Sequence, residues 1–177
     1  MCMRSTRRVD FHFYNKGNEM VSPTEWGPNA WKLLHGIAER IGYNKNITIA
    51  KNEKNEIRIT LRNFGSLLPC KTCQTHYREW LHLHPPEVFL NEFGEDLRDG
   101  MRKWVWQLHE DVNRRREVVS GISYESLHEL YGSIQLRECA MQHRSIKFKG
   151  FQFRILKPEE WNIGWKHLDL LLRILNF

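Results

Sequence analysis

The sequence predicts an all-α fold, because three kinds of signal agree along its length. Apolar residues recur at helical spacing in five segments between residues 22 and 137. Prolines and capping residues bound these segments: Ser22 and Pro23 form a helix start, and Pro69 ends a helical pattern. A chain of 177 residues with 41% apolar content is also long enough to bury one hydrophobic core.

The helices are expected in a simple order along the chain. The stretch from Gly42 to Asn55 is rich in Asn and Lys and is expected to be a loop. The third main helix should begin at Cys70, and Ser123 should cap the fifth. With one short connecting helix at 87–92, the expected helical ranges are 26–41, 57–68, 70–83, 87–92, 95–116 and 123–136.

Three regions are predicted from changes in composition. Residues 1–21 form a polar, basic arm, residues 22–137 a helical domain, and residues 138–177 a C-terminal extension. In the extension, apolar residues nearly alternate over 146–155, which predicts a short hairpin bent at Gly150. Residues 158–177 should form an amphipathic helix, whose Trp and Leu stripe suits packing on its own domain, a subunit contact or a partner.

Composition argues against several classes of protein. No run of about 18 apolar residues occurs, so we expect no membrane span. The first twenty residues contain no apolar segment of a secretory signal. The net charge of +6 is spread over scattered basic pairs, which favours a solvated basic surface over nucleic-acid binding.

The four cysteines are one close pair, Cys70 and Cys73, and two singletons, Cys2 and Cys139. A pair spaced C-x-x-C at the start of a helix can cycle between dithiol and disulfide, because the helix N-terminus favours thiolate. The same pair with His82 and His84 could bind a metal, although the spacing is short for a zinc finger. Redox, metal and structural roles therefore remain open on this motif alone.

Two blocks rich in Trp and His flank the cysteine pair. On a helix Trp31 and His35 share a face, and so do His109, Val112, Asn113 and Arg116 in the second block. Together they offer flat aromatic surfaces, imidazoles, a carboxamide and a guanidinium. Such a set suits a planar heterocycle with a phosphate tail, but aromatic residues at this spacing are also typical of ordinary core packing.

The three blocks in this order resemble the ERV/ALR family of FAD-linked sulfhydryl oxidases. The chain reads W-G-x-x-x-W-x-x-L-H from Trp26, P-C-x-x-C from Pro69 and W-x-x-x-x-H-x-x-V-N from Trp104. The resemblance runs from Trp26 to Gly132 and is strongest to the short versions carried by large DNA viruses. It therefore implies a place in the host cytoplasm or the virion.

The resemblance implies a four-helix bundle with a short fifth helix that encloses FAD. Cys70 would exchange with the thiol substrate, a protein or a thioredoxin-like carrier, and Cys73 would face the flavin. Electrons would pass from this pair to FAD and then to oxygen, giving hydrogen peroxide. The implied cofactor-binding residues are Trp26, Gly27, Trp31, His35, Leu67, His109, Val112, Asn113, Arg116 and Tyr131.

The resemblance also implies a homodimer, formed through the first two helices. Two features depart from the family pattern. Glu110 stands where the family usually has Asn, which places a negative charge near the expected cofactor. A second cysteine pair is missing, so Cys2 and Cys139 are expected to be unpaired or structural rather than to shuttle electrons.

Overall fold

The computed structural model describes residues 21–176, and in this part of the chain it is helical with no β-strand. The prediction of an all-α fold is confirmed. Most of the predicted basic arm, and Cys2 with it, lie outside the described residues. The helices are α1 (Pro23–Ala38), α2 (Ile47–Asn63), the 3-10 helix η1 (Phe64–Leu67), α3 (Lys71–Leu83), α4 (Glu87–Leu90), α5 (Gly94–Arg115), α6 (Leu127–Tyr131), α7 (Leu136–Ser145), α8 (Lys147–Gln152) and α9 (Pro158–Ile174).

The helix starts that rest on clear capping signals were predicted well. The Ser22 side chain accepts a hydrogen bond from the Thr24 amide at the start of α1. Asn46 caps α2 in the same way, so α2 begins about ten residues before the expected start, and the predicted loop over 42–55 is wrong after residue 46. The first turn of α2 carries exposed apolar side chains, Ile47 at 59% and Ile49 at 40%, and mostly charged and amide residues follow, so the segment shows no clear apolar face.

The predicted fifth helix over 123–136 is also wrong in its extent. Only Leu127–Tyr131 is helical there, and Leu136 already belongs to α7. The predicted boundary between residues 137 and 138 thus falls inside one helix. The bundle and the extension share α7, and no linker separates them.

The predicted hairpin over 146–155 is wrong, because this segment contains α8 and the connector that follows it. The alternation of aromatic residues does not reflect a sheet face: Phe148 is 70% exposed, whereas Gly150 is buried against Leu156. A single hairpin with no further strand beside it leaves edge hydrogen-bonding groups open, whereas a helical turn satisfies its own backbone. Helix is therefore the better solution here.

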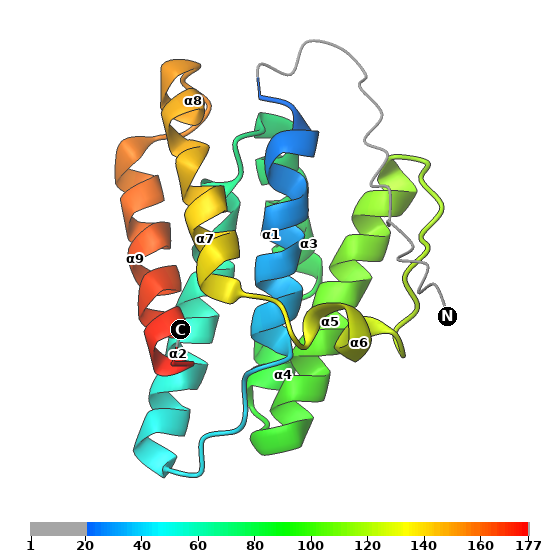
Figure 1. Ribbon diagram of the computed structural model, residues 1–177, viewed down its shortest axis with the longest axis vertical. Coiled ribbons are helices and arrows are strands. Elements are labelled where there is room, and N and C mark those ends of the chain that lie inside the picture. The colour runs from blue at the N-terminus through cyan, green and yellow to red at the C-terminus, as the bar shows by residue number, and fades with distance from the viewer. Residues whose placement is uncertain (1–20, 177) are drawn as a thin grey trace, which may run out of the picture.

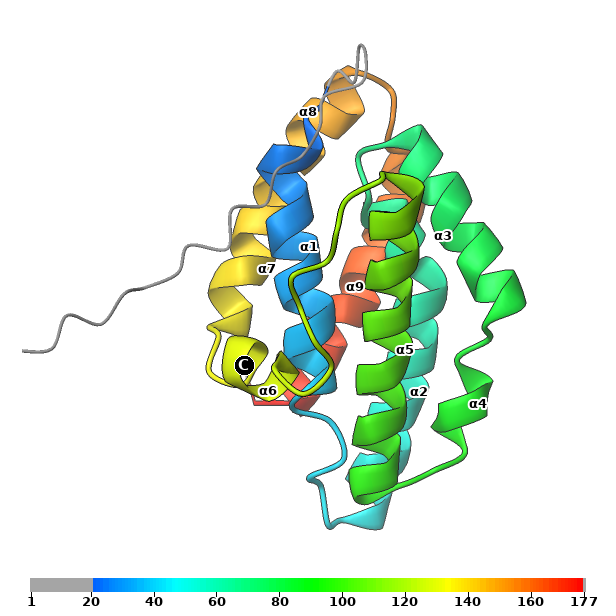
Figure 2. The same ribbon diagram turned by 90° about the vertical axis from the view of Figure 1, so that its right-hand side faces the viewer.

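The long helices run roughly along one axis of the molecule (Figures 1 and 2). On one side α1 packs against α5, and on the other side α7 packs along α1. Helix α9 packs along α2 and η1, where Gly164 allows a close approach: a Cβ at this position would lie 2.7 Å from Ser66 Oγ. Within residues 21–176, no helix is both long and apolar enough to cross a bilayer.

The apolar stripe of the C-terminal helix packs on the chain's own bundle. Trp161 and Leu168 are 2% and 0% exposed, and both belong to the same continuous core as the residues of α1 and α5. Of the three roles that the sequence left open for this stripe, the first is confirmed. The extension is thus part of the structure that holds the candidate site.

Candidate functional site

The two close cysteines form a disulfide at the N-terminus of α3. Cys70 is the N-cap residue of the helix, and its sulfur accepts a hydrogen bond from the Cys73 amide at 3.1 Å. The backbone N–H groups and dipole of this helix end favour negative charge on sulfur. When the disulfide is broken, the helix terminus therefore stabilises the thiolate that is released.

A cavity of about 630 Å³ opens beside this disulfide, between α1, α3 and α5. Its volume lies within the range of roughly 300–1,000 Å³ that is common for sites of small molecules and cofactors. Cys73 forms part of the wall, so the disulfide borders the cavity directly. The other lining residues are Pro23, Trp26, Gly27, Ala30, Trp31, Leu34, Phe64, Leu68, Thr72, His76, Tyr77, Leu108, Val112, Arg115, Arg116 and Glu117.

The two cysteines lie toward different faces of α3. His76 and Tyr77 lie one turn after Cys73 and line the cavity with it, as helical spacing requires. Cys70 is only 5% exposed and does not line the cavity, and it shares a face of the helix with Gln74. The Gln74 side chain donates to the Leu68 carbonyl at 2.8 Å and so fixes the backbone just before the cysteine motif.

Four aromatic rings form a cluster next to the cavity, at Trp31. Trp31 stacks on His109 with 3.9 Å between ring centroids, and Tyr131 stacks on His35 at 4.3 Å. A hydrogen bond of 3.1 Å joins His35 Nε2 and His109 Nδ1. One of these nitrogens must donate and the other accept. The two stacking contacts cover one face of each of the four rings.

Burial keeps both histidines neutral. Desolvation, followed by the charge of His109, lowers the pKa of His35 to about 3, and desolvation lowers the pKa of His109 to about 4. At neutral pH the cluster therefore presents uncharged, flat surfaces. This suits stacking on an aromatic ligand rather than attraction of an anion.

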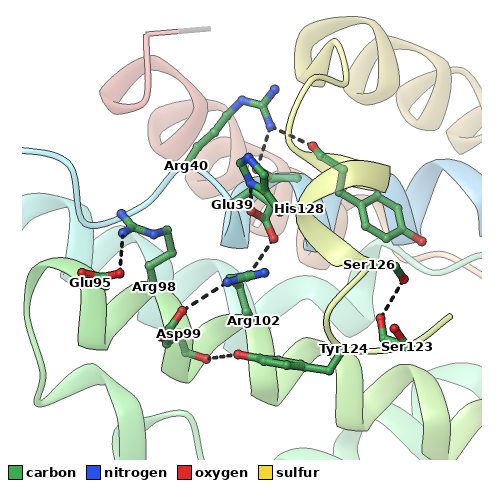
Figure 3. A network of polar contacts seen from close by, with 12 residues as sticks. Glu39, Arg40, Glu95, Arg98, Asp99, Arg102, Ser123, Tyr124, Ser126 and His128 are labelled. Carbon is green, nitrogen blue, oxygen red and sulfur yellow. Dashed lines mark hydrogen bonds and ion pairs between the residues drawn. The ribbon is translucent and has the colours of Figure 1, made fainter.

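A polar network holds the short helix α6, and with it Tyr131, against the bundle (Figure 3). Glu39, which is 6% exposed, accepts a hydrogen bond from Arg102 at 2.7 Å and bonds His128 Nδ1 at 2.9 Å. The Arg40 guanidinium donates to the backbone carbonyls of Tyr131 at 3.3 Å and Ile134 at 2.6 Å. These bonds position the Tyr131 ring on His35.

The structure divides the ten predicted cofactor residues into two groups. Five of them line the cavity, and five do not. The lining group is Trp26, Gly27, Trp31, Val112 and Arg116. The other group is His35, His109, Tyr131, Asn113 and Leu67.

The residues of the second group have other surroundings. His35, His109 and Tyr131 lie in the ring cluster that adjoins Trp31. The Asn113 side-chain amide donates a hydrogen bond to the Glu110 carboxylate at 3.3 Å. Glu110, which departs from the family pattern, therefore binds the amide group that was expected to contact the cofactor. The Leu67 carbonyl accepts a hydrogen bond of 2.9 Å from His143, a residue of the extension.

Several residues of the cavity are not among those predicted from the sequence. His76 and Tyr77 could have been found, because they lie three and four residues after Cys73. Arg115 could not have been predicted in this way. It lies at the last residue of α5, and the sequence does not show where the helix ends, so it does not show which of Arg115 and Arg116 faces the cavity. Arg115 also pairs with Asp111 at 2.7 Å and with Glu79 at 3.1 Å.

The metal site considered for the cysteine pair has no counterpart in the described part of the chain. The two sulfurs are bonded to each other, and His84 stacks on Trp80 with ring centroids 3.8 Å apart. Among residues 21–176, no group of three or more Cys, His, Asp or Glu side chains is arranged to hold a metal ion.

Comparison with known proteins agrees with the motif order. Residues 28–126, more than half of the chain, match the model of the Erv1 / Alr family. Over 91 residues the chain is 29% identical to the mitochondrial FAD-linked sulfhydryl oxidase erv1 of Schizosaccharomyces pombe, a match that covers 51% of this chain but 45% of that protein. No solved structure matches the chain significantly. The chain belongs to the Erv1 / Alr family.

Proposed function

We propose that this chain is an FAD-dependent sulfhydryl oxidase that forms disulfides in protein thiols. The observation that carries the proposal is the placement of the Cys70–Cys73 disulfide. It caps α3, and Cys73 lies on the wall of a cavity of about 630 Å³. A dithiol–disulfide couple beside a site for an aromatic cofactor can pass two electrons to that cofactor.

The residues of the cavity fit a flavin. Trp26 and Trp31 supply aromatic surface, and the buried Trp26 Nε1 has no hydrogen-bond partner within the described chain, so it is a donor available to a ligand. Arg115 and Arg116 line the same cavity and bring positive charge for a pyrophosphate. Cys73 would face the isoalloxazine ring of a bound FAD, and the ring cluster of Trp31, His35, His109 and Tyr131 would lie on the side of its adenine.

The two cysteines divide the thiol chemistry between them. A substrate thiolate attacks the Cys70 sulfur, a mixed disulfide forms, and Cys73 leaves as a thiolate beside the cavity. A second substrate thiolate then attacks the substrate sulfur of the mixed disulfide and releases Cys70, with oxidised substrate as the product. The resulting Cys70–Cys73 dithiol would be reoxidised to the disulfide by giving two electrons to a bound FAD, whose chemistry would supply the route to oxygen and hydrogen peroxide.

The finer features implied by the resemblance stay predictions. These are the likeness to short viral forms, the place in host cytoplasm or virion, and the homodimer. Part of the surface of the first two helices is already covered within the chain, because α7 packs along α1 and α9 packs along α2. A dimer built on the first two helices would have to use surface that these two helices leave exposed, and sedimentation of the flavin-loaded protein would measure its mass.

A spectrum and an oxygen electrode test the proposal. Purified protein should be yellow with bound flavin, and should consume oxygen and produce peroxide with dithiothreitol. Cys70→Ala and Cys73→Ala should abolish turnover and leave the flavin absorbance, because neither substitution removes the aromatic walls of the cavity. A folded but colourless protein, or full turnover in Cys73→Ala, would overturn it.

A further inference from the structure

The connector between α8 and α9 lies over the face of α3 that carries Cys70. Gln74, one turn after Cys70, directs its amide nitrogen both to the Leu68 carbonyl and, at 3.4 Å, to the Ile155 carbonyl. Side chains on a helix lean toward its N-terminus, so this contact brings residue 155 toward Cys70. Figure 2 shows the connector passing beside the start of α3. A substrate that reaches Cys70 from this side therefore meets the connector, which follows directly on α8.

This part of the extension carries charge of one sign only. Between Cys139 and Pro158 the chain has five basic residues and no acidic one. They are Arg144, Lys147, Lys149, Arg154 and Lys157. Lys149 pairs with Glu25, and Lys157 with Glu160 at 2.6 Å. Within residues 21–176, no ion pair involves Arg144, Lys147 or Arg154, so their charge is available to a partner.

Exposed aromatic side chains accompany the basic ones. Phe148 is 70% exposed and Phe153 is 38% exposed, whereas the neighbouring Ile146 and Leu156 are buried. Lys147 holds its ammonium 5.0 Å from the Phe148 ring. The surface therefore combines positive charge with exposed aromatic area. Arg and aromatic side chains are enriched among the residues that contribute most to protein interfaces.

The surface is fixed before any partner arrives. Arg154 has a φ of 54°, and the amides of Ile155 and Leu156 both donate to the Gly150 carbonyl, at 2.9 and 3.1 Å. This turn requires glycine at position 150, because a Cβ there would lie 2.2 Å from the Leu156 side chain. A preformed surface loses little conformational entropy on binding.

We propose that α8 and the connector, residues 147–157, form the docking surface for the dithiol substrate and select an acidic segment with an apolar side chain near its cysteines. The acidic groups would pair with Lys147 and Arg154, and the apolar side chain would pack on Phe148 or Phe153. This inference rests on the proposed oxidase function, because it assigns Cys70 as the sulfur that the substrate attacks.

Two dithiol peptides with the same C-x-x-C core test the proposal. One has Asp, Glu and Leu around the core, and the other has Lys in place of the acids. Oxygen consumption by the flavin-loaded enzyme at low salt gives kcat/KM for each. We expect the acidic peptide to be preferred, and Arg154→Gln and Lys147→Gln each to reduce that preference by about three-fold, the size of an exposed charge pair. The double variant should reduce it by roughly ten-fold.

The matched control is Lys51→Gln, an exposed lysine in α2, which begins at the end of the molecule opposite α8 (Figure 1). Its peptide preference should equal that of the unchanged enzyme, and dithiothreitol serves as the uncharged substrate for normalising every variant. Turnover of dithiothreitol without any peptide preference would overturn the docking surface alone. Salt-sensitive binding of DNA or anionic vesicles by residues 147–157, with no effect on peptide turnover, would also overturn it. Absence of dithiothreitol turnover would instead overturn the oxidase function.

Discussion

Acid should destabilise this protein below about pH 6.5, because three histidines are buried in neutral form. Burial lowers the pKa of His35 to about 3 and that of His109 to about 4. Burial also lowers the pKa of His143, in the extension, to about 4, while its bond to the Leu67 carbonyl acts in the opposite direction. Their ordinary value is 6.5. Between about pH 6.5 and 4 the unfolded chain therefore binds more protons than the folded one, so stability falls as the pH falls.

The magnitude follows from the same values. Between pH 7.0 and 5.5 the three histidines together remove roughly 4 kcal/mol from the free energy of unfolding, which is slightly more than about 1 kcal/mol for each. With a urea dependence of about 2 kcal/mol/M, the unfolding midpoint should fall by roughly 2 M over this interval. Urea titrations followed by Trp fluorescence, at constant ionic strength and with flavin bound, measure it.

One substitution separates the buried histidines from other acid effects. In His143→Gln the dependence of the unfolding free energy on pH should fall to about two thirds, since one of three groups no longer titrates. His82→Gln is the matched control, because this side chain is exposed on α3. A free energy of unfolding that stays constant from pH 7.0 to 5.5, or an unchanged dependence in His143→Gln, would refute the reasoning.

Three further predictions follow from the packing. Leu168→Ala should lower the free energy of unfolding by about 2–5 kcal/mol and Tm by roughly 5–15 °C, because Leu168 is 0% exposed between α9 and the bundle; thermal unfolding by circular dichroism measures this. Glu39→Gln should weaken the bond to Arg102 and the anchoring of α6, so hydrogen exchange of residues 127–131 should become faster while that of α2 does not change. Cys139→Ser should keep the rate of oxygen consumption with dithiothreitol, since Cys139 is buried and free, and a lost rate would assign it an electron-transfer role.

The sequence predicted the helices that depend on local signals and failed where tertiary packing decides. The N-cap at Ser22 and the cysteine at the start of α3 are local, and both were placed correctly. The hairpin was wrong because an alternating pattern over 146–155 arises here from a short helix and a buried glycine turn. No property of those ten residues alone shows that Gly150 closes on Leu156.

The site shows the same division. Helical periodicity placed Trp31 and His35 on one face, and they do lie together. It could not show that Trp31 reaches the cavity while His35 is 2% exposed and pairs with His109, because depth within a bundle depends on the neighbouring helix. The bond between Asn113 and Glu110 was not predicted either, although the departure at Glu110 pointed to this turn of α5.

The contacts of the extension tie its stability to the cysteine motif. His143 bonds the Leu67 carbonyl, Gly164 of α9 lies against η1, and Ile155 accepts from Gln74, so three parts of the extension hold the segment on either side of Cys70. Loosening the extension would therefore loosen the turn that places the Cys70 sulfur at the end of α3. This coupling has a consequence for any truncated form: removal of residues 138–177 would expose the apolar faces of α1 and α2 and free the cysteine turn together. Loss of activity in such a form would not by itself reveal which residues bind the substrate, whereas single charge substitutions on α8 and the connector leave these contacts in place.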